Sequence, residues 1–375
     1  MHPLIHWIES NDPHQARWRS ESNMPPPKRV MIADDTMKAD DAYRLACEGT
    51  ALLWRGDFQN AKQLLQAMSR RNTRKLERSR KVAAQPGEAF HLHRQAQSQR
   101  ARTLAMILIP LDADYGIPLR RAPDMRLACS EAYGPGEEAS VASLRELLGL
   151  VGAHEWRKKG VEIAQLDARI HPWYGVFSPV RGEYLELVQQ APLPSTELAF
   201  DIGTGTGVIA ALLAQRGVQH IVATDMDQRA LNCARDNLSR LGLDKQVDVI
   251  EADLFPAGKA PLIVCNPPWI PARPSSPVEH AIYDPDSRML RGFLGGLAAH
   301  LTRGGEGWLI ISDIAEHLEL RTREELLTLI VASGLQVIER MDILPHHPKT
   351  ADKTDPLHAA RAAEVTSLWR LASSS

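Results

Sequence analysis

The feature of this sequence that most restricts its fold is the regular alternation of short apolar runs and helix-like segments after residue 197. Helical periodicity is found at about 206–216, 227–241, 287–302 and 322–333. Strands that alternate with helices form mostly parallel sheets covered on both faces. This half of the chain is therefore predicted to be an α/β domain. Its predicted strands are Leu198–Ile202, His220–Thr224, Val247–Ile250, Leu262–Cys265, Gly307–Ser312, Leu335–Met341 and Ala363–Leu371.

The remaining chain is divided by changes in composition. Residues 1–38 contain three consecutive prolines and no apolar periodicity, so they are predicted to be a flexible extension. Residues 39–135 are predicted to be helical or mixed, with helices from Asp40 to about Trp54 and from Phe58 to Arg71. Residues 136–190 are predicted to hold connecting helices, one capped by Ser140, and an aromatic hairpin at 161–179. The α/β domain is then 191–375.

Composition narrows the class of protein. The chain is 44% hydrophobic and 24% charged, with a formal net charge of −2, as is ordinary for a globular protein. The longest apolar run is interrupted by Pro110 and is much shorter than the ~20 residues of a membrane span. No secretory signal opens the sequence, so we expect a cytoplasmic protein. Four scattered cysteines without a C-x-x-C pair predict neither a zinc site nor a disulfide framework, and we expect no metal.

One segment, 62–81, is strongly basic. A stripe of this kind can meet phosphates of a nucleic acid. The alternative is a solvated helix face, which is equally compatible with the pattern. No aromatic residue interrupts the segment, so base stacking is not predicted there. Its densest part carries Arg70, Arg71, Arg74, Lys75, Arg78, Arg80 and Lys81 against Glu77.

A glycine-rich loop follows the first predicted strand of the α/β domain. Ligands of open α/β sheets bind at the carboxyl ends of strands, where glycines let them approach the backbone. The spacing G-x-G-x-G argues against a dinucleotide site, because Val208 stands where a third glycine is required. Asp225 ends the second strand, where an acid accepts ribose hydroxyls. A tight structural turn is the alternative interpretation. The loop reads Asp201, Ile202, Gly203, Thr204, Gly205, Thr206, Gly207.

The fourth strand of the domain ends in Asn266-Pro267-Pro268-Trp269. Prolines lack the N–H group that a sheet needs, so the chain must leave the sheet there. The Asn266 amide and the carbonyls of Asn266 and Pro267 remain as acceptors beside an aromatic face. Such a turn suits a flat substrate that carries an NH2 group.

Together these motifs resemble the class I S-adenosylmethionine-dependent methyltransferases, and most of all the release-factor glutamine N5-methyltransferase family. The resemblance covers roughly 160–375 and includes Gly175 to Glu183 before the glycine loop. It departs from the family at Trp269, where Tyr is usual, and in a longer, more basic N-terminal region. It implies a Rossmann-like, seven-stranded, mostly parallel sheet with an antiparallel last strand. It further implies that 191–375 is the catalytic domain and that 39–135 recognises the substrate.

The resemblance also implies roles for single residues. Asp201 and the loop Gly203, Thr204, Gly205, Thr206, Gly207 would wrap the methionine end of S-adenosylmethionine. Asp225 would hold the ribose, Met226, Asp253 and Leu254 the adenine, and Asn266 would lie between cofactor and substrate. Asn266, Pro267, Pro268 and Trp269 would be catalytic, and no general base or metal would be needed. Candidate substrate contacts are Tyr174, Phe177, Pro179, Asp286 and His346.

The expected activity is N-methylation of a planar NH2 group, with a protein glutamine amide as the first candidate. An exocyclic amine of adenine or guanine in RNA or DNA is the alternative, and either acceptor is a macromolecule. A non-catalytic binding module is a different possibility, although the Asn and both prolines that it could have lost are present. A nicotinamide-dependent oxidoreductase is disfavoured by the glycine spacing.

Overall fold

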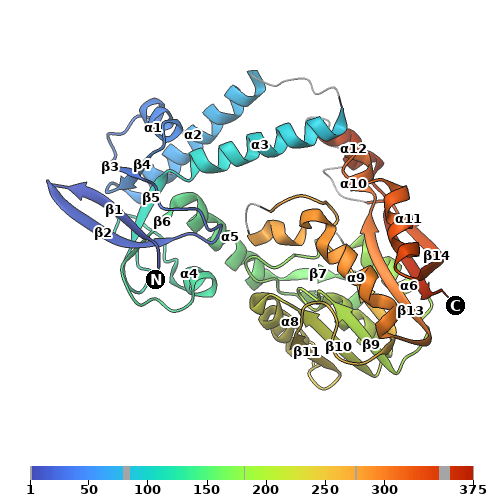
Figure 1. Cartoon of the computed structure of the whole chain (residues 1–375). Helices are drawn as coiled ribbons and strands as arrows, with labels where there is room; N and C mark the ends of the chain where they lie inside the picture. The colour runs from blue at the N-terminus through green and yellow to red at the C-terminus, as the bar shows by residue number, and fades with distance from the viewer. Residues whose placement is uncertain (1, 79–84, 181, 275–276, 346–354, 375) are drawn as a thin grey trace. The chain divides into compact units, whose positions relative to one another are not determined.

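The computed structural model describes residues 2–78, 85–180, 182–274, 277–345 and 355–374. The chain splits into two compact units (Figure 1). The first contains residues 1–83 and 91–155, and the second contains 84–90 and 156–375. None of the described helices is both long enough and apolar enough to cross a bilayer.

The first unit is built on a six-stranded sheet in the order β1-β2-β6-β5-β4-β3. Strands β3, β4 and β5 are parallel, β6 is antiparallel to β5 and parallel to β2, and β1 is antiparallel to β2. The strands are β1 (Leu4–Glu9), β2 (Asp12–Arg19), β3 (Arg29–Ala33), β4 (Thr50–Trp54), β5 (Ile107–Leu111) and β6 (Ser140–Ser143). The helices are α1 (Ala39–Cys47), α2 (Phe58–Arg78), α3 (Pro86–Leu104), α4 (Arg126–Tyr133) and α5 (Leu144–Lys159), of which α3 and α5 also contribute residues to the second unit.

The prediction that 1–38 is a flexible extension was wrong, because these residues form three of the six strands. Strands β1 and β2 form a hairpin whose turn residues Ser10 and Asn11 both have positive φ angles. Two left-handed residues in succession match the right-handed twist of the flanking strands. A Ser-Asn pair is a weaker turn signal than Asn-Gly, which explains why the hairpin was missed.

The N-terminal region contains several helices, but they accompany a sheet that the sequence did not predict. The helix expected from Asp40 to Trp54 ends at Cys47, and Gly49, with a φ of 81°, turns the chain into the buried strand β4. Ser140 does not cap a helix but begins β6, whose four residues are all buried. A short apolar run is compatible with a strand or a buried helix, and only the tertiary environment decides between them.

The second unit has a seven-stranded sheet in the order β11-β10-β9-β12-β13-β15-β14. The five strands β11, β10, β9, β12 and β13 run parallel to one another. Strand β15 lies between β13 and β14 and is antiparallel to both. The predicted mostly parallel sheet with an antiparallel last strand is therefore confirmed. The strands are β9 (Leu198–Ile202), β10 (His220–Asp225), β11 (Val247–Glu251), β12 (Ala260–Cys265), β13 (Leu301–Ser312), β14 (Leu335–Ile343) and β15 (Thr366–Ser373).

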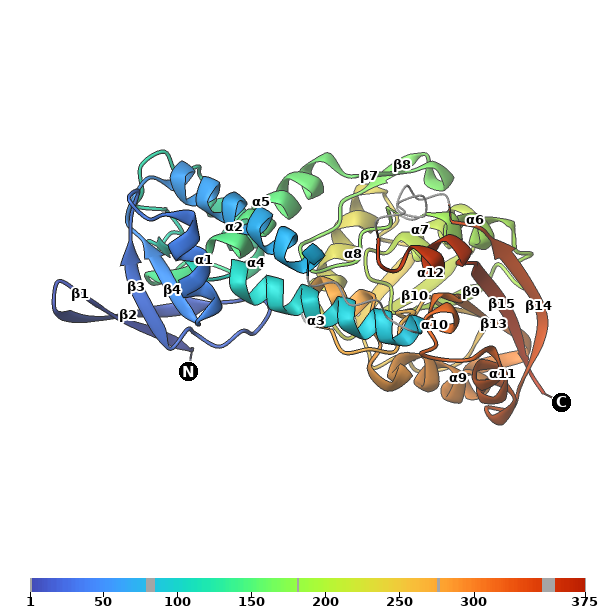
Figure 2. The ribbon, with the colours of Figure 1, turned by 90° about the horizontal axis from the view of Figure 1, so that it is seen from above.

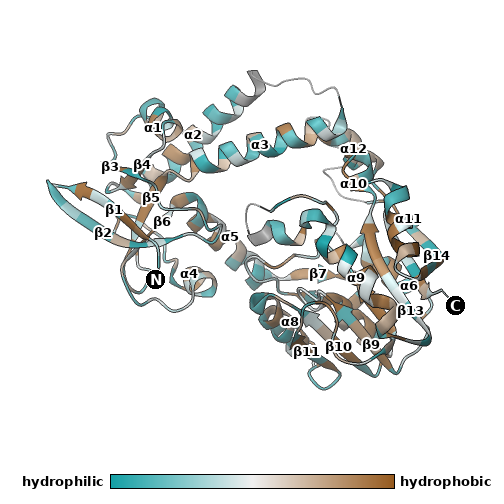
Figure 3. Ribbon diagram, viewed as in Figure 1, coloured by the Kyte–Doolittle hydropathy of each residue, from teal (hydrophilic) through white to brown (hydrophobic). Residues whose placement is uncertain are grey.

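Helices cover both faces of this sheet, with α6 and α7 on one side and α9 and α11 on the other (Figure 2). Alternate strand residues supply the two cores: Val264 packs with α7 residues, whereas Ile263 packs with α9 residues. The strands are correspondingly apolar (Figure 3). The helices are α6 (Glu183–Gln190), α7 (Val208–Gln215), α8 (Gln228–Arg240), α9 (Arg288–His300), α10 (Ile314–His317), α11 (Arg323–Ala332) and α12 (His358–Ala363).

The predicted hairpin at 161–179 is present, but it is shorter than expected. Strands β7 (Val161–Ile163) and β8 (Ala168–Ile170) pair around the 3-10 turn η1 (Ala164–Leu166). The aromatic residues of the segment follow the hairpin in a loop that leads to α6. Two further 3-10 turns, η2 (Pro277–Ala281) and η3 (Pro285–Ser287), lie between β12 and α9.

Candidate active site

The glycine loop connects the carboxyl end of β9 to α7. Gly203, Gly205 and Gly207 have φ angles of 71°, 56° and 80°, a region that L side chains rarely adopt. A side-chain carbon added at Gly205 would meet no atom within 4 Å, so the chain leaves open space above this residue. The loop is tied to the next strand by the Thr204 N–H, which donates to the Thr224 carbonyl at 2.8 Å.

Asp225 holds the loop from the end of β10. One of its carboxylate oxygens accepts from the Gly205 N–H at 3.1 Å, and the other accepts from the Asp227 N–H at 3.0 Å. Burial raises the pKa of Asp225, although both N–H groups favour the charged form. The side chain lines the cavity described below, so its oxygens face the space next to the loop.

Asp201 lies beneath the loop and is fully buried. Its Oδ2 accepts from the Thr204 hydroxyl at 2.7 Å and from the Ala210 N–H at 3.2 Å, whereas its Oδ1 accepts from no group in the described chain. Burial raises the pKa of Asp201 to about 7, against the two hydrogen bonds, and the charge of Asp225 adds to the rise. Asp201 therefore positions the loop from below.

This raised pKa predicts how stability changes with pH. The folded state holds the Asp201 proton more tightly than the unfolded state, so the contribution of Asp201 to stability is lost as pH rises from 3.8 to about 7. In Asp201→Asn the amide cannot ionise, and its NH2 group replaces the unpartnered Oδ1. We expect the free energy of unfolding of the variant, relative to wild type, to rise across that window and level off above it. Urea unfolding at several pH values measures this difference, and a pH-independent difference would contradict it.

The Asn266 turn leaves the sheet at the end of β12, beside β9. The Trp269 indole N–H donates to Asn266 Oδ1 at 2.9 Å. Trp269 packs against three apolar clusters of the second unit, two on opposite faces of the sheet and one around α10. The orientation of the Asn266 carboxamide is thereby set by a neighbour that is itself held by packing.

A cavity of about 1040 Å³ brings these elements together, and all of its lining residues belong to the second unit. Its walls come from the glycine loop, the ends of β10 to β12 and the first turn of α9. The predicted residues that line it are Phe177, Gly203, Thr204, Gly205, Thr206, Asp225, Met226, Asp253, Leu254, Asn266, Pro267, Pro268 and Trp269.

Other predicted residues do not line the cavity. Asp201 and Gly207 support the loop from behind, and Gly207 lies against Ala234 of α8. Pro179 and Tyr174 are outside the lining, and the Tyr174 ring lies under the Arg229 guanidinium. His346 lies outside the described residues.

Asp286 is also absent from the lining, and neither it nor Ser287 caps α9 through its side chain. The buried carboxylate of Asp284 performs this function, because it accepts from the N–H groups of Met289 and Leu290 at 3.0 and 3.1 Å. Asp286 and Ser287 instead turn the chain, with φ angles of 56° and 53°. The start of α9 is fixed by Asp284.

Several lining residues were missed by sequence reasoning. Phe90 comes from the start of α3 and packs with Ile314, Leu318 and Leu357. Glu364 is buried and accepts from the Ser312 hydroxyl at 2.7 Å. No local signal marks such residues, because their position depends on contacts across many residues of sequence. The other missed lining residues include Tyr283, Arg288, Met289 and Arg361.

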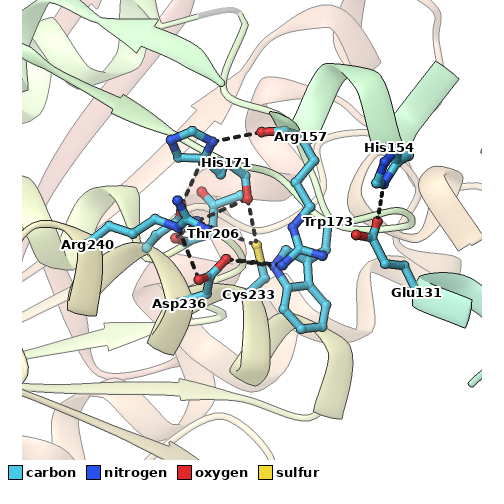
Figure 4. Close-up of polar contacts among 10 residues, drawn as sticks. Glu131, His154, Arg157, His171, Trp173, Thr206, Cys233, Asp236 and Arg240 are labelled. Carbon is cyan, nitrogen blue, oxygen red and sulfur yellow. Dashed lines mark hydrogen bonds and ion pairs between the residues drawn. The ribbon is translucent and has the colours of Figure 1, made fainter. Parts of the chain in front are cut away.

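A polar network anchors the loop that supplies Gly175, Val176 and Phe177 to the cavity (Figure 4). The buried Asn237 of α8 accepts from the His171 N–H at 2.7 Å and donates to the Thr206 carbonyl at 3.0 Å. One carboxamide therefore connects this loop to the glycine loop.

A second part of the network is centred on Asp236. Its carboxylate accepts from the Trp173 indole N–H at 3.2 Å and from Arg157 at 3.3 Å (Figure 4). The Arg157 guanidinium also lies 4.1 Å from the centre of the Trp173 ring. These contacts hold the loop without any residue of the cavity itself.

Among the described residues, no group of three or more His, Cys, Asp or Glu side chains is placed to bind a metal.

Comparison with known proteins shows what this part of the chain is similar to. Residues 174–323, which lie wholly in the second unit, match the methyltransferase small domain. The glycine loop, Asp225 and the Asn266 turn all fall within the matched residues.

Two curated relatives and one solved structure illustrate the similarity. The release factor glutamine methyltransferase of Cereibacter sphaeroides is 35% identical over 130 residues, 34% of this chain and 43% of that protein. The tRNA1(Val) (adenine(37)-N6)-methyltransferase of Bacteroides thetaiotaomicron is 31% identical over 136 residues, 33% of this chain and 56% of that protein. The chain thus spans about half the length of these relatives. A methyltransferase structure from Pyrococcus furiosus is 17% identical with a TM-score of 0.40, covering 60% of this chain and 98% of that one.

Proposed function

We propose that the protein is an S-adenosylmethionine-dependent N-methyltransferase that acts on a planar NH2 group. The observation that carries the proposal is the single cavity that holds the glycine loop and Asp225 on one side and the Asn266 turn on the other. A donor site and an acceptor site for an amine are thereby adjacent. The methyltransferase small domain supports the same class of reaction.

The residues of the cavity fit the cofactor. The open space at Gly205 admits a ligand close to the backbone, and the adjacent Asp225 carboxylate suits the two hydroxyls of a ribose. Met226 and Asp253 follow β10 and β11 and would contact the adenine. When bound, S-adenosylmethionine supplies an electrophilic methyl group.

The chain's contribution to the reaction would be the orientation of the amine. The nitrogen of an amide or aromatic amine is a poor nucleophile because its lone pair is delocalised. If Asn266 Oδ1 and the Pro267 carbonyl each accept one N–H, the NH2 group is held in one direction. Orientation of this kind can lower a barrier by ~7–11 kcal/mol. Phe90, Trp269 and Ile270 in the cavity wall would limit the access of water to the amine, which would strengthen these hydrogen bonds.

Trp269 would act as a positioning residue in this arrangement. Its indole N–H uses one acceptor position of Asn266 Oδ1 and leaves the second for the substrate. The bond also distinguishes the oxygen from the nitrogen of the carboxamide, so that the acceptor and not the donor faces the amine.

Trp269→Phe removes this N–H but keeps an aromatic ring. We expect kcat to fall about fivefold, the value of one neutral hydrogen bond, with the affinity for S-adenosylhomocysteine unchanged. Labelled methyl transfer and calorimetry measure the two quantities. Trp18→Phe is the matched control, because it removes an indole N–H that donates to the Met24 carbonyl in the first unit. An equal fall in both variants, or none in Trp269→Phe, would refute the role.

The first substrate candidate is the side-chain amide of a protein glutamine, in line with the aromatic loop before the glycine motif and the Cereibacter relative. A nucleobase amine is the second candidate, and two observations favour it. Phe90 and Tyr283 add aromatic rings to the cavity wall. Helix α2 exposes Arg70, Arg71 and Arg74, although the segment 79–81 lies outside the described residues.

Two measurements test the proposal. Calorimetry should detect binding of S-adenosylhomocysteine and not of NAD, and the reverse result would overturn it. Transfer of labelled methyl groups from S-adenosylmethionine into fractionated cell extract, followed by protease or nuclease digestion of the product, then identifies the acceptor. Label released by protease supports a protein substrate, and label released by nuclease supports RNA or DNA. No transfer into any fraction would contradict an enzymatic role.

A further inference from the structure

The first turn of α9 faces the loops that would bind the cofactor. The Met289 side chain lies against Gly203, and Gly292 lies against the Leu254 side chain. Residues 288, 289 and 292 all line the cavity. The first five residues of α9 therefore supply part of the cavity wall.

Arg288 begins this turn and reaches the two positions proposed for adenine. One terminal nitrogen of its guanidinium donates to Asp253 Oδ2 at 2.9 Å. The other lies 3.8 Å from the Met226 sulfur. These partners come from the ends of two different strands, β10 and β11, so a single side chain spans the adenine end of the cavity.

The exposure of these side chains argues against a role of the ion pair in stabilising the fold. The side chains of Arg288 and Asp253 are 65% and 57% exposed, and an exposed pair contributes little to stability. Met226 is 54% exposed as well. The guanidinium and the Met226 sulfur are in contact, so a flat ring that stacks on the guanidinium would displace the Met226 contact.

The position of Arg288 is fixed by its backbone and not by this pair. The buried Asp284 carboxylate holds the start of α9, and the left-handed residues Asp286 and Ser287 direct the chain into it. The backbone of Arg288 is therefore held at the edge of the cavity independently of the ion pair with Asp253. A carboxylate accepts up to about four hydrogen bonds, so Asp253 can bind Arg288 and an adenine amino group together.

We propose that Arg288 is a clasp for the adenine end of the cofactor, with its guanidinium covering the ring from the α9 side while it remains bound to Asp253. This inference rests on the proposed function, since it assumes that the cavity takes S-adenosylmethionine. It adds a residue of α9 to the proposed cofactor site. It also adds to the role expected of Asp253, which would orient the Arg288 side chain as well as accept a hydrogen bond from the adenine amino group.

The test is calorimetry with two probes, S-adenosylhomocysteine and 5′-methylthioadenosine, which share the adenine end and differ at the amino-acid end. Arg288→Ala should weaken both by the same factor, about five- to tenfold, as expected for loss of a cation over a ring. Arg288→Lys should weaken both by a smaller factor, because Lys keeps the charge but lacks the planar group. Melting temperatures should be unchanged, since the pair is exposed.

Arg291→Ala is the matched control. Arg291 lies on the same helix and is exposed, its guanidinium donates to the Asp286 carbonyl at 3.2 Å, and it does not line the cavity. Equal weakening by Arg291→Ala would show a general effect of charge and overturn the clasp. If Arg288→Ala weakens the binding of S-adenosylhomocysteine alone, Arg288 contacts the amino-acid end of the cofactor, and the proposed adenine contact is refuted. Unchanged affinity in Arg288→Ala would refute the role of Arg288 and leave the proposed function intact. If wild type binds neither probe, the proposed function itself is refuted.

Discussion

Asn266→Ala should lower the turnover of methyl transfer about 100-fold, the size of loss that follows when a reacting group is misplaced by about 1 Å. The variant removes the acceptor that would orient the amine and leaves the Trp269 indole N–H without its partner. Binding of S-adenosylhomocysteine should persist, because Gly205 and Asp225 are unaltered. Single-turnover transfer and calorimetry separate the two effects.

Two further variants sharpen this prediction. Asn266→Asp keeps an acceptor at Oδ1 and the bond from Trp269, so it should retain more activity than Asn266→Ala. When Trp269→Phe is added to Asn266→Ala, turnover should not fall further, because Trp269 is proposed to act only through Asn266. An additive loss would mean that Trp269 acts independently. Unchanged turnover in Asn266→Ala with intact binding would remove Asn266 from the mechanism.

Asp225→Ala should have the largest effect on cofactor affinity. It removes the carboxylate proposed to hold the ribose and also the acceptor that holds the Gly205 N–H at 3.1 Å. Charged hydrogen bonds contribute about 1.5–3 kcal/mol, so we expect the Kd for S-adenosylhomocysteine to rise about 10- to 150-fold. The rise in melting temperature that the ligand gives to wild type should shrink accordingly.

The control for Asp225 is Asp248→Asn on the neighbouring strand. Asp248 is an exposed acid that pairs with His220 and lies outside the cavity lining. It changes the net charge of the domain in the same way as Asp225→Ala. A comparable loss of affinity in both variants would show that charge alone is responsible, and an unchanged Kd in Asp225→Ala would exclude the carboxylate from the site.

The strands that carry the candidate site were predictable from the sequence because their signals are local. Strand β9 was predicted with its observed bounds, and β10 and β11 differ by one residue at their ends. The signal is a short run rich in apolar residues that stops at Gly203, Asp225 or Glu251. Once the strands are parallel, their carboxyl ends must meet at one edge, which brings the glycine loop and Asn266 together.

What the sequence did not predict depends on contacts between distant residues. The bond from Trp269 to Asn266 requires a particular turn geometry, and Phe90 reaches the cavity from a helix far earlier in the chain. Arg288 was not recognised because charged residues at helix starts are common and only the fold shows which loop they face. The first unit was misjudged because β4 and β6 are short apolar segments whose pairing partners are remote.

The placement of β15 has a consequence for how the catalytic sheet forms. Strand β14 pairs only with β15 among the described strands, and β15 comes later in the chain than every other strand of the sheet. Residues 335–343 consequently have an unsatisfied edge until 366–373 insert between them and β13. Assembly of this sheet cannot proceed strand by strand in order of synthesis. It ends with a long-range insertion step, the kind of event that slows folding and leaves strand edges unpaired in the meantime.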